Sequence, residues 1–161
     1  KSNFKKVLLV VCDYNISQTK KQLETLEEIY KYLNKNFKII IKPHPGNNKI
    51  NLENSKIKFS ITDKSISELI NKVDCVFTSN TTTVALEFFY LGKYIISMLD
   101  PSKLNLSPLR KEKGVKFITS SKDLENSLRR YKSNFDLVRN NYSCFYINKD
   151  FRYWLALIED N

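Results

Sequence analysis

Residues 75–92 read CVFTSNTTTVALEFFYLG, and this stretch decides the fold. It begins with an apolar run at residues 75–78, continues with a polar segment, and then becomes apolar on nearly every side over residues 81–91. The first run has the length and composition of a buried strand, and the last has those of a buried helix that Gly92 ends. The stretch therefore predicts one strand–turn–helix unit of a parallel α/β sheet.

Further apolar runs of the same kind lie on both sides of this unit. They are short, rich in β-branched residues and without polar alternation, which is typical of strands that are covered on both faces. With the first run included, the predicted strands are residues 7–12, 37–41, 57–61, 75–78, 94–99 and 115–118.

The segments between these runs have the apolar spacing of helices. We expect helices over residues 17–35, 66–73, 81–91 and 124–131, and a last one in a C-terminal helical tail at residues 136–161. The second of these opens with Ser65 three residues before Glu68, the pattern of a capping box. Regular alternation of strand and helix predicts the α/β class, with a Rossmann-like doubly wound parallel sheet of about six strands in a single domain.

Length and composition exclude several classes of protein. The chain has 161 residues, of which 42% are hydrophobic, so it can bury the core of one domain. A single histidine, His44, rules out sites that need two, and the three scattered cysteines form no zinc or disulfide pattern. The three glycines cannot form a P-loop or a GxGxxG motif. We therefore expect no metal and no tightly bound cofactor.

The net charge of +10 raises the question of nucleic-acid binding. The positive charge comes mainly from lysines scattered along the chain, and arginine, which binds phosphate with a rigid fork, is scarce. We therefore expect nucleic acid to be the less favoured partner. The chain starts at Lys1 without a methionine or a signal-peptide pattern, so we expect it to be part of a longer protein.

The first candidate site is Lys42-Pro43-His44-Pro45-Gly46, which follows the second predicted strand. The prolines restrict the backbone on either side of His44, so the imidazole is held at the carboxyl edge of the sheet. There it could donate a hydrogen bond to a phosphate. From the residues alone, a rigid turn without a ligand explains the pattern equally well.

The second candidate site follows the fourth predicted strand. Hydroxyl and amide side chains crowd the start of a helix, where backbone N–H groups attract anions. A simple helix cap needs only one of them, so we favour a phosphate site. Its residues are Ser79, Asn80, Thr81, Thr82 and Thr83, with Glu87 further along the helix. Other polar residues that follow strands at the same edge are Asp13, Asn15, Thr62, Asp63 and Lys64.

These motifs resemble the C-terminal half of GT-B glycosyltransferases. The resemblance rests on KPHP at residues 42–45, on SNTTTVALE at residues 79–87 with Gly92-Lys93 behind it, and on CFYIN and RYWL at residues 144–148 and 152–155. It is strongest for the bacterial surface-polysaccharide group with His-Pro and Ser/Thr motifs, which includes sialyltransferases and Kdo transferases. Asn80 departs from the usual pair of small residues and leaves the type of donor open.

The resemblance implies a role for each matching residue. His44 would contact the donor phosphate and assist departure of the nucleotide, helped by Lys42, Pro45 and Gly46. The Ser/Thr motif would hold the phosphate and Glu87 the ribose, whereas residues 62–64 would lie near the base. Lys42 and Lys93 flank the two motifs, which should meet a phosphate or an anionic sugar.

The resemblance also implies the biological setting. The whole chain, residues 1–161, would be the nucleotide-sugar-binding domain of a metal-independent enzyme that makes capsule or lipopolysaccharide. A CMP-linked donor is favoured, and the acceptor would be a glycan or a lipid-linked glycan. The enzyme would act in the cytoplasm, either free or as a peripheral protein at the inner face of the cytoplasmic membrane. Without its N-terminal GT-B domain the chain would be inactive. The alternatives are a sugar-nucleotide epimerase or hydrolase of the same fold, and a non-catalytic basic module for nucleotides or nucleic acid.

Overall fold

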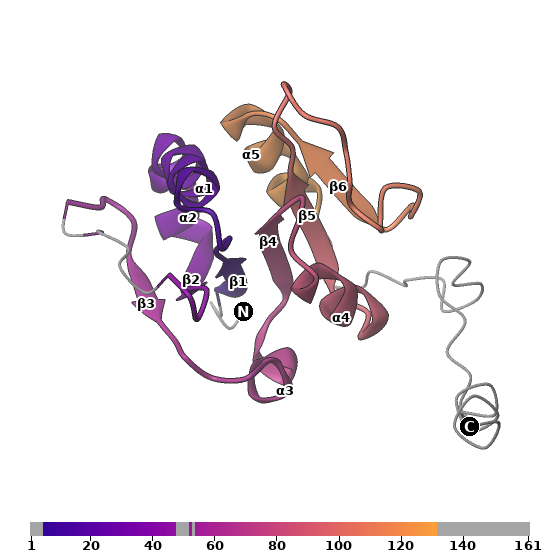
Figure 1. Ribbon diagram of the computed structural model, residues 1–161. Coiled ribbons are helices and arrows are strands. Elements are labelled where there is room, and N and C mark those ends of the chain that lie inside the picture. Colours follow the sequence, from indigo (N-terminus) through magenta and orange to yellow (C-terminus); the bar gives the residue numbers. More distant parts are fainter. Residues whose placement is uncertain (1–4, 48–51, 53, 132–161) are drawn as a thin grey trace, which may run out of the picture.

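The computed structural model describes residues 5–47, 52 and 54–131, so the predicted helical tail at 136–161 lies outside the described residues. Its centre is a six-stranded parallel sheet with the strand order β3-β2-β1-β4-β5-β6 (Figure 1). The strands are β1 (Lys6–Val11), β2 (Phe37–Lys42), β3 (Phe59–Ile61), β4 (Cys75–Ser79), β5 (Tyr94–Met98) and β6 (Val115–Ile118). This confirms the predicted α/β class, the Rossmann-like topology and the number of strands.

Helices cover both faces of the sheet (Figure 1). One core joins the sheet to α1, α2 and α5 through Leu26, Leu33 and Leu124. A second core joins the other face to α3 and α4 through Leu69 and Phe88. The helices are α1 (Ile16–Glu28), α2 (Tyr30–Asn36), α3 (Ile66–Leu69) with the short 3₁₀ helix η1 (Ile70–Lys72), α4 (Val84–Tyr90) and α5 (Ser121–Arg130).

Burial explains why the central strands carry no polar alternation. Every residue of β4 and β5 is buried, as expected for strands with helices on both faces. The edge strand β3 is shorter than the predicted run 57–61 and begins at Phe59, because only residues 59–61 pair with β2. Within the described residues, no helix combines the length and the apolar character that crossing a bilayer requires.

The prediction of a single helix over residues 17–35 is wrong, because the structure has two helices there, α1 and α2, separated at Ile29. The backbone of Ile29 leaves the helical region (φ −113°, ψ 21°). Its amide donates to the carbonyl of Leu26, three residues earlier, and not to the carbonyl four residues earlier as in an α-helix. The break lets the Ile29 side chain enter the core, where it is 7% exposed. Apolar spacing continues across the break, so periodicity alone could not reveal it.

The helix predicted over residues 81–91 is shorter and less buried than expected. Helix α4 begins at Val84, and residues 81–83 form the turn that precedes it. Glu87 is exposed and Leu91 is 56% exposed, because only the face that carries Ala85 and Phe88 packs on the sheet. Glu87 therefore faces solvent, whereas the sequence predicts a helix that is buried on nearly every side. The helix predicted to reach residue 131 likewise ends one residue earlier, since Tyr131 is the cap of α5.

Two shorter predictions from the sequence are confirmed. The backbone amide of Ser65 donates to the Glu68 carboxylate over 2.9 Å, as the capping box requires. Gly92 ends α4 with a positive φ of 76°, and its amide donates to the Phe89 carbonyl over 2.9 Å. Lys93 directly precedes β5 at the amino edge of the sheet, opposite the carboxyl ends of the strands, so it cannot flank a ligand there.

The positive φ at Gly92 gives a direct test of this helix end. We expect Gly92→Ala to lower the free energy of unfolding by about 1–2 kcal/mol, because a β-carbon is strained in the left-handed region. Gly92→Asn should cost less, since asparagine tolerates that region better. Urea unfolding followed by circular dichroism measures both, and equal stability of Gly92→Ala and the wild type would contradict this account.

Candidate functional site

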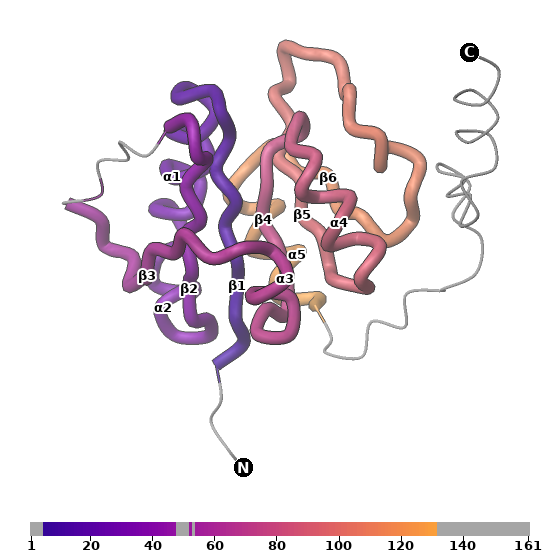
Figure 2. Tube along the Cα trace, turned by 60° about the horizontal axis from the view of Figure 1, so that its bottom comes forward, coloured from indigo at the N-terminus to yellow at the C-terminus, as the bar shows by residue number. Residues whose placement is uncertain are grey.

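The strand order places a topological switch between β1 and β4. From this point the chain crosses to β2 and β3 on one side and to β5 and β6 on the other, while the strands keep one direction (Figures 1 and 2). Crevices outside the carboxyl ends of such strands are where open α/β sheets bind ligands. Asp13 follows β1 there, and Ser79 ends β4 beside it.

The Asp13 carboxylate holds together the two loops at this switch. Its Oδ1 accepts from the backbone amide of Asn15 over 2.7 Å. Its Oδ2 accepts from the hydroxyl of Thr81 over 2.8 Å and from the hydroxyl of Ser79. Asp13 is only 7% exposed, so these donors take the place of water around a buried charge.

The direction of these hydrogen bonds follows from the number of protons. A hydroxyl has one proton to donate, and that of Ser79 goes to Asp13. The contact of 2.8 Å between the hydroxyls of Ser79 and Thr82 must therefore use the proton of Thr82. The hydroxyl protons of Ser79, Thr81 and Thr82 are thus all directed to Asp13, either directly or through Ser79.

The same contacts keep Asp13 ionised. Burial raises the pKa of the Asp13 carboxyl, but the hydrogen bonds from Ser79, Asn15 and Thr81 outweigh burial and hold the pKa below its usual value. A fixed negative charge therefore lies at the switch between β1 and β4.

A cavity of about 380 Å³ opens beside this cluster, and we call it the switch cavity. Its lining consists of Asp13, Asn15, Gln18, Ser79, Asn80, Thr81, Met98, Asp100, Lys103, Leu104 and Leu106. The Oδ1 atom of Asn80 is buried and has no hydrogen-bond partner among the described residues. On the opposite wall, Asp100 lies 3.2 Å from the ammonium of Lys21 and 3.9 Å from that of Lys103.

His44 lies in a tight turn at the end of β2. The amide of Asn47 donates to the His44 carbonyl over 2.8 Å and closes the turn. The amide of Gly46 donates to His44 Nδ1 over 3.0 Å, so the proton of the neutral ring is on Nε2. The ring packs edge-on against Tyr14, with 5.3 Å between ring centroids. The imidazole is therefore held with a defined tautomer, as a donor would need to be.

Gly46 packs closely against two rings. A β-carbon on Gly46 would lie 3.1 Å from Tyr14 Cε2 and 3.4 Å from His44 Nδ1. The sequence suggested a glycine for a sharp turn, and the structure adds that a side chain here would press on the rings of Tyr14 and His44.

A second cavity, of about 360 Å³, lies beside this turn, and we call it the histidine cavity. It is lined by Lys42, Pro43, His44, Pro45, Ile61, Thr62 and Asp63. The Lys42 ammonium donates to the Lys64 carbonyl over 2.7 Å and to the Asp63 carbonyl over 3.4 Å. Lys42 thereby ties the end of β2 to the loop after β3.

The structure brings most of the predicted site residues to one edge, but not into one pocket. Asn15 lines the switch cavity and also caps α1, because its side chain accepts from the amide of Ser17 over 2.9 Å. Thr83 and Glu87 are exposed and line neither cavity. Gly46, Lys64 and Thr82 line neither cavity, but each forms a hydrogen bond with a residue that does.

Sequence reasoning missed some of the lining residues. Gln18 and Lys103 did not stand out in the sequence as site residues. Asp100 follows a predicted strand at the carboxyl edge, where polar residues are expected to face a ligand, but the sequence assigned it no role. Leu104 and Leu106 carried no signal, because their loop has no regular spacing.

The described residues offer no obvious metal or thiol chemistry. Residues 5–47, 52 and 54–131 contain no group of three or more histidine, cysteine or acidic side chains placed to hold a metal ion. Cys12 lies next to Asp13, but burial raises the pKa of its thiol to about 12. The thiol is therefore protonated at neutral pH and is a poor nucleophile.

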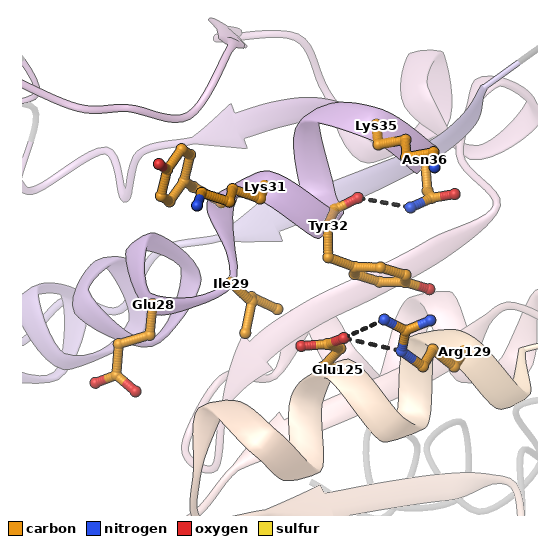
Figure 3. Close-up of a pocket in the computed structure, with 9 residues that line it drawn as sticks. Glu28, Ile29, Lys31, Tyr32, Lys35, Asn36, Glu125 and Arg129 are labelled. Carbon is orange, nitrogen blue, oxygen red and sulfur yellow. Dashed lines mark hydrogen bonds and ion pairs between the residues drawn. The ribbon is translucent and has the colours of Figure 1, made fainter.

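A larger groove of about 660 Å³ lies away from this edge, between α2 and α5 (Figure 3). Two of its charged groups, Arg129 and Glu125, form an ion pair with each other. The guanidinium of Arg129 lies 4.3 Å from the centre of the Tyr32 ring, and its Nε donates to Glu125 over 2.8 Å. Figure 3 shows Arg129 beneath Tyr32 and beside Glu125. We therefore place the candidate site at the switch between β1 and β4.

Comparison with solved structures identifies the fold. The chain is similar to the glycotransferase of kitacinnamycin, with a TM-score of 0.58 and 13% identity over 80% of this chain. It is also similar to the solution structure of ALG13, with a TM-score of 0.58 and 19% identity over 81%. A third similar structure is SnogD from Streptomyces nogalater, with a TM-score of 0.56 and 10% identity over 78%.

The domain therefore has the fold of one half of a GT-B glycosyltransferase. At these identities the likeness shows the fold alone. The chain spans 35% of the kitacinnamycin glycotransferase and 38% of SnogD, but 87% of the ALG13 structure. No protein-family model and no curated protein sequence matches the chain.

The buried charge of Asp13 predicts a pH dependence of stability. At pH 7 we expect Asp13→Asn to lower the free energy of unfolding by about 1–3 kcal/mol, because two hydroxyls and an amide lose a charged acceptor. A carboxyl with a lowered pKa stabilises the fold above its unfolded pKa of about 3.9 and loses that effect as the pH falls. The difference between variant and wild type should therefore shrink below about pH 4.

Urea unfolding at several pH values measures this difference. The matched control is Asp74→Asn, since Asp74 also accepts from a backbone amide, that of Val7 over 2.6 Å, but at the amino edge. A difference for Asp13→Asn that stays constant from pH 7 to pH 3 would show that Asp13 is not held ionised by these bonds.

Proposed function

We propose that this chain is the donor-binding domain of a glycosyltransferase and that it binds a nucleotide-activated sugar at the carboxyl edge of its sheet. One observation carries the proposal. In a domain with the fold of a GT-B half, two cavities flank the switch point, and the only histidine of the chain lies in one of them with its tautomer fixed. A crevice at a switch point is the expected ligand site of such a sheet.

We assign the donor phosphate to the side of His44. The Nε2 proton of His44 can donate to a phosphate oxygen and stabilise the departing nucleotide. Pro45 and Gly46 fix the turn, and Lys42 adds a positive charge to the same cavity. Thr62 and Asp63 would face the base, and Lys64 would shape that loop.

We assign the Ser/Thr motif a role other than the phosphate binding that the resemblance implies. Because Ser79, Thr81 and Thr82 direct their protons to Asp13, their hydroxyls are poor donors to a phosphate. We assign them, with Asn80, to the wall of the donor site beside the sugar. Thr83 and Glu87 would reach a donor only at its margin.

The remaining parts of the proposal concern the whole enzyme. The length ratios support a second, complementary domain that supplies the acceptor site and the catalytic base. We propose that the enzyme is metal-independent, prefers a CMP-linked donor, and builds bacterial surface polysaccharide on the cytoplasmic side of the membrane. The motif resemblance supports this setting.

Calorimetric titration of the chain with CMP, CDP, UDP and a short DNA duplex tests the proposed function. We expect one nucleotide to bind, and His44→Ala to weaken that binding at least about tenfold, which is the size of one charged hydrogen bond. Lys122→Ala, an exposed residue of α5, is the control and should bind as the wild type does. Salt-sensitive DNA binding without any response to nucleotides would instead favour the basic nucleic-acid module.

A second prediction concerns catalysis. We expect the isolated chain to bind the donor without transferring or hydrolysing its sugar, because the complementary domain supplies the acceptor site and base. Chromatographic detection of released nucleotide after long incubation checks this. Turnover at typical enzyme rates by the chain alone, about 1 per second or more, would favour the epimerase or hydrolase alternative.

A further inference from the structure

We propose that the amino edge of the sheet, where the strands begin, is a docking surface for an anionic phospholipid bilayer. This edge lies opposite the two cavities and takes no part in the nucleotide binding proposed above. It would add a partner to the proposed function, but binding to a bilayer can be measured without any nucleotide.

Each strand of the sheet has a lysine at or near its start. The strands are parallel, so they all begin at the same edge (Figure 1). In the order of the strands across the sheet, from β3 to β6, these residues are Lys58, Lys38, Lys5, Lys72, Lys93 and Lys113. We call them the lysine row. Neighbouring strands lie about 4.8 Å apart, so the row extends over about 24 Å.

The ammonium groups of the lysine row are accessible to a partner. All of these lysines are exposed except Lys93, which is half-buried. In the part of the chain that the structure describes, none of them forms an ion pair. The ammonium of Lys5 donates to the carbonyl of Asn34 over 2.6 Å, and this neutral acceptor leaves its charge uncompensated.

Acidic residues do not balance the lysine row. Asp74 and Glu112 lie at the same edge, and the carboxylate of Asp74 already accepts from a backbone amide. At the carboxyl edge, by contrast, Asp13, Asp63 and Asp100 each follow a strand by two residues and lower the net charge there. The positive charge of the domain is therefore concentrated at the amino edge.

Stabilisation of helix ends explains only part of the row. A cation near the C-terminus of a helix offsets the helix dipole, and this accounts for Lys72, which ends η1. Lys58 and Lys113 directly or closely precede strands, and Lys38 lies within β2, so none of the three caps a helix. Their place at one edge therefore points to an anionic partner.

An exposed leucine at this edge favours lipid over nucleic acid. Leu91 caps the end of α4, is 56% exposed, and lies two residues before Lys93 of the row. Among the described residues, the other exposed large apolar side chains, such as Tyr14, lie toward the carboxyl edge. Single strands of nucleic acid stack on aromatic rings, whereas an aliphatic side chain among lysines matches the headgroup region of an anionic bilayer.

The length of the strands fixes how the domain would lie on a bilayer. A strand of six residues such as β1 spans about 20 Å, so the two cavities would open about that far from the headgroups, toward a donor dissolved in water. The Debye length at physiological salt is about 8 Å. The lysine row would therefore feel the lipid phosphates, whereas the acidic residues at the carboxyl edge would be screened from them.

Co-sedimentation of the full chain with lipid vesicles tests the proposal. Vesicles of phosphatidylcholine and phosphatidylglycerol in equal parts are compared with vesicles of phosphatidylcholine alone, at low and at high concentrations of NaCl. We expect binding to the anionic vesicles at low salt, much weaker binding to the zwitterionic ones, and loss of binding at high salt because exposed charges are screened.

Two double variants separate the lysine row from net charge. A lysine near an anionic surface strengthens binding roughly fivefold, so Lys58→Gln with Lys113→Gln should weaken binding about twentyfold. The control, Lys20→Gln with Lys122→Gln, removes the same charge from exposed positions near the starts of α1 and α5, which lie toward the carboxyl edge. It should bind within about threefold of the wild type, since these positions lie beyond the Debye length from the lipid.

A further pair of variants tests the contribution of the leucine. Leu91→Asn should weaken binding to the anionic vesicles severalfold, because an apolar side chain no longer enters the interface. Ile16→Asn is the matched control, since Ile16 is 69% exposed at the opposite edge, and it should bind as the wild type does. Circular dichroism of each variant shows that folded protein is compared.

Three outcomes would overturn the proposal. If the two double variants bind equally, net charge and not the lysine row attracts the bilayer. If a DNA duplex binds more tightly than the vesicles and Leu91→Asn changes neither affinity, the partner is a nucleic acid. If the folded chain does not bind the anionic vesicles at low salt, the amino edge is not a docking surface for lipid. Each of these results leaves the proposed nucleotide binding standing, and a failed nucleotide titration leaves this proposal standing.

Discussion

The carboxylate of Asp13 is the contact on which the candidate site depends. It accepts hydrogen bonds from the loop after β1, where Asn15 also caps α1, and from the loop after β4, where Ser79 and Thr81 lead into α4. These are the two strands at which the chain changes direction across the sheet. A single buried charge thus fixes the relative positions of two loops that regular secondary structure leaves free. The hydroxyl protons of Ser79 and Thr81 are engaged within this cluster.

The two cavities offer different chemical groups to a donor. The histidine cavity presents a cation and an imidazole N–H, and the switch cavity presents acceptors and apolar side chains. Tyr14 links the two regions along the chain, because its ring contacts His44 and it follows Asp13 in the sequence. A nucleotide sugar has an anionic part and a hydroxylated part of comparable size. The arrangement therefore fits a ligand that joins both kinds of group.

Much of the fold could be predicted from the sequence, since unalternating apolar runs identify strands that are buried on both faces. The break at Ile29 could not, because both halves of the segment keep the same apolar spacing. The late start of α4 could not either, since residues 81–83 are compatible with a helix or a turn. The position of His44 followed from its place after β2. The central part played by Asp13 did not, because a sequence shows neither the spatial approach of β1 and β4 nor the direction in which hydroxyl protons point.

The most direct test of the account is an NMR titration of the isotope-labelled chain with CMP and UDP, in which backbone amide shifts map the contact. The account predicts that the amides of His44, Gly46, Thr62 and Asp63 shift most with a nucleotide alone, and that those of residues 79–81 and 103–106 follow when the sugar is attached. Shifts confined to the groove between α2 and α5, around Tyr32 and Arg129, would contradict it.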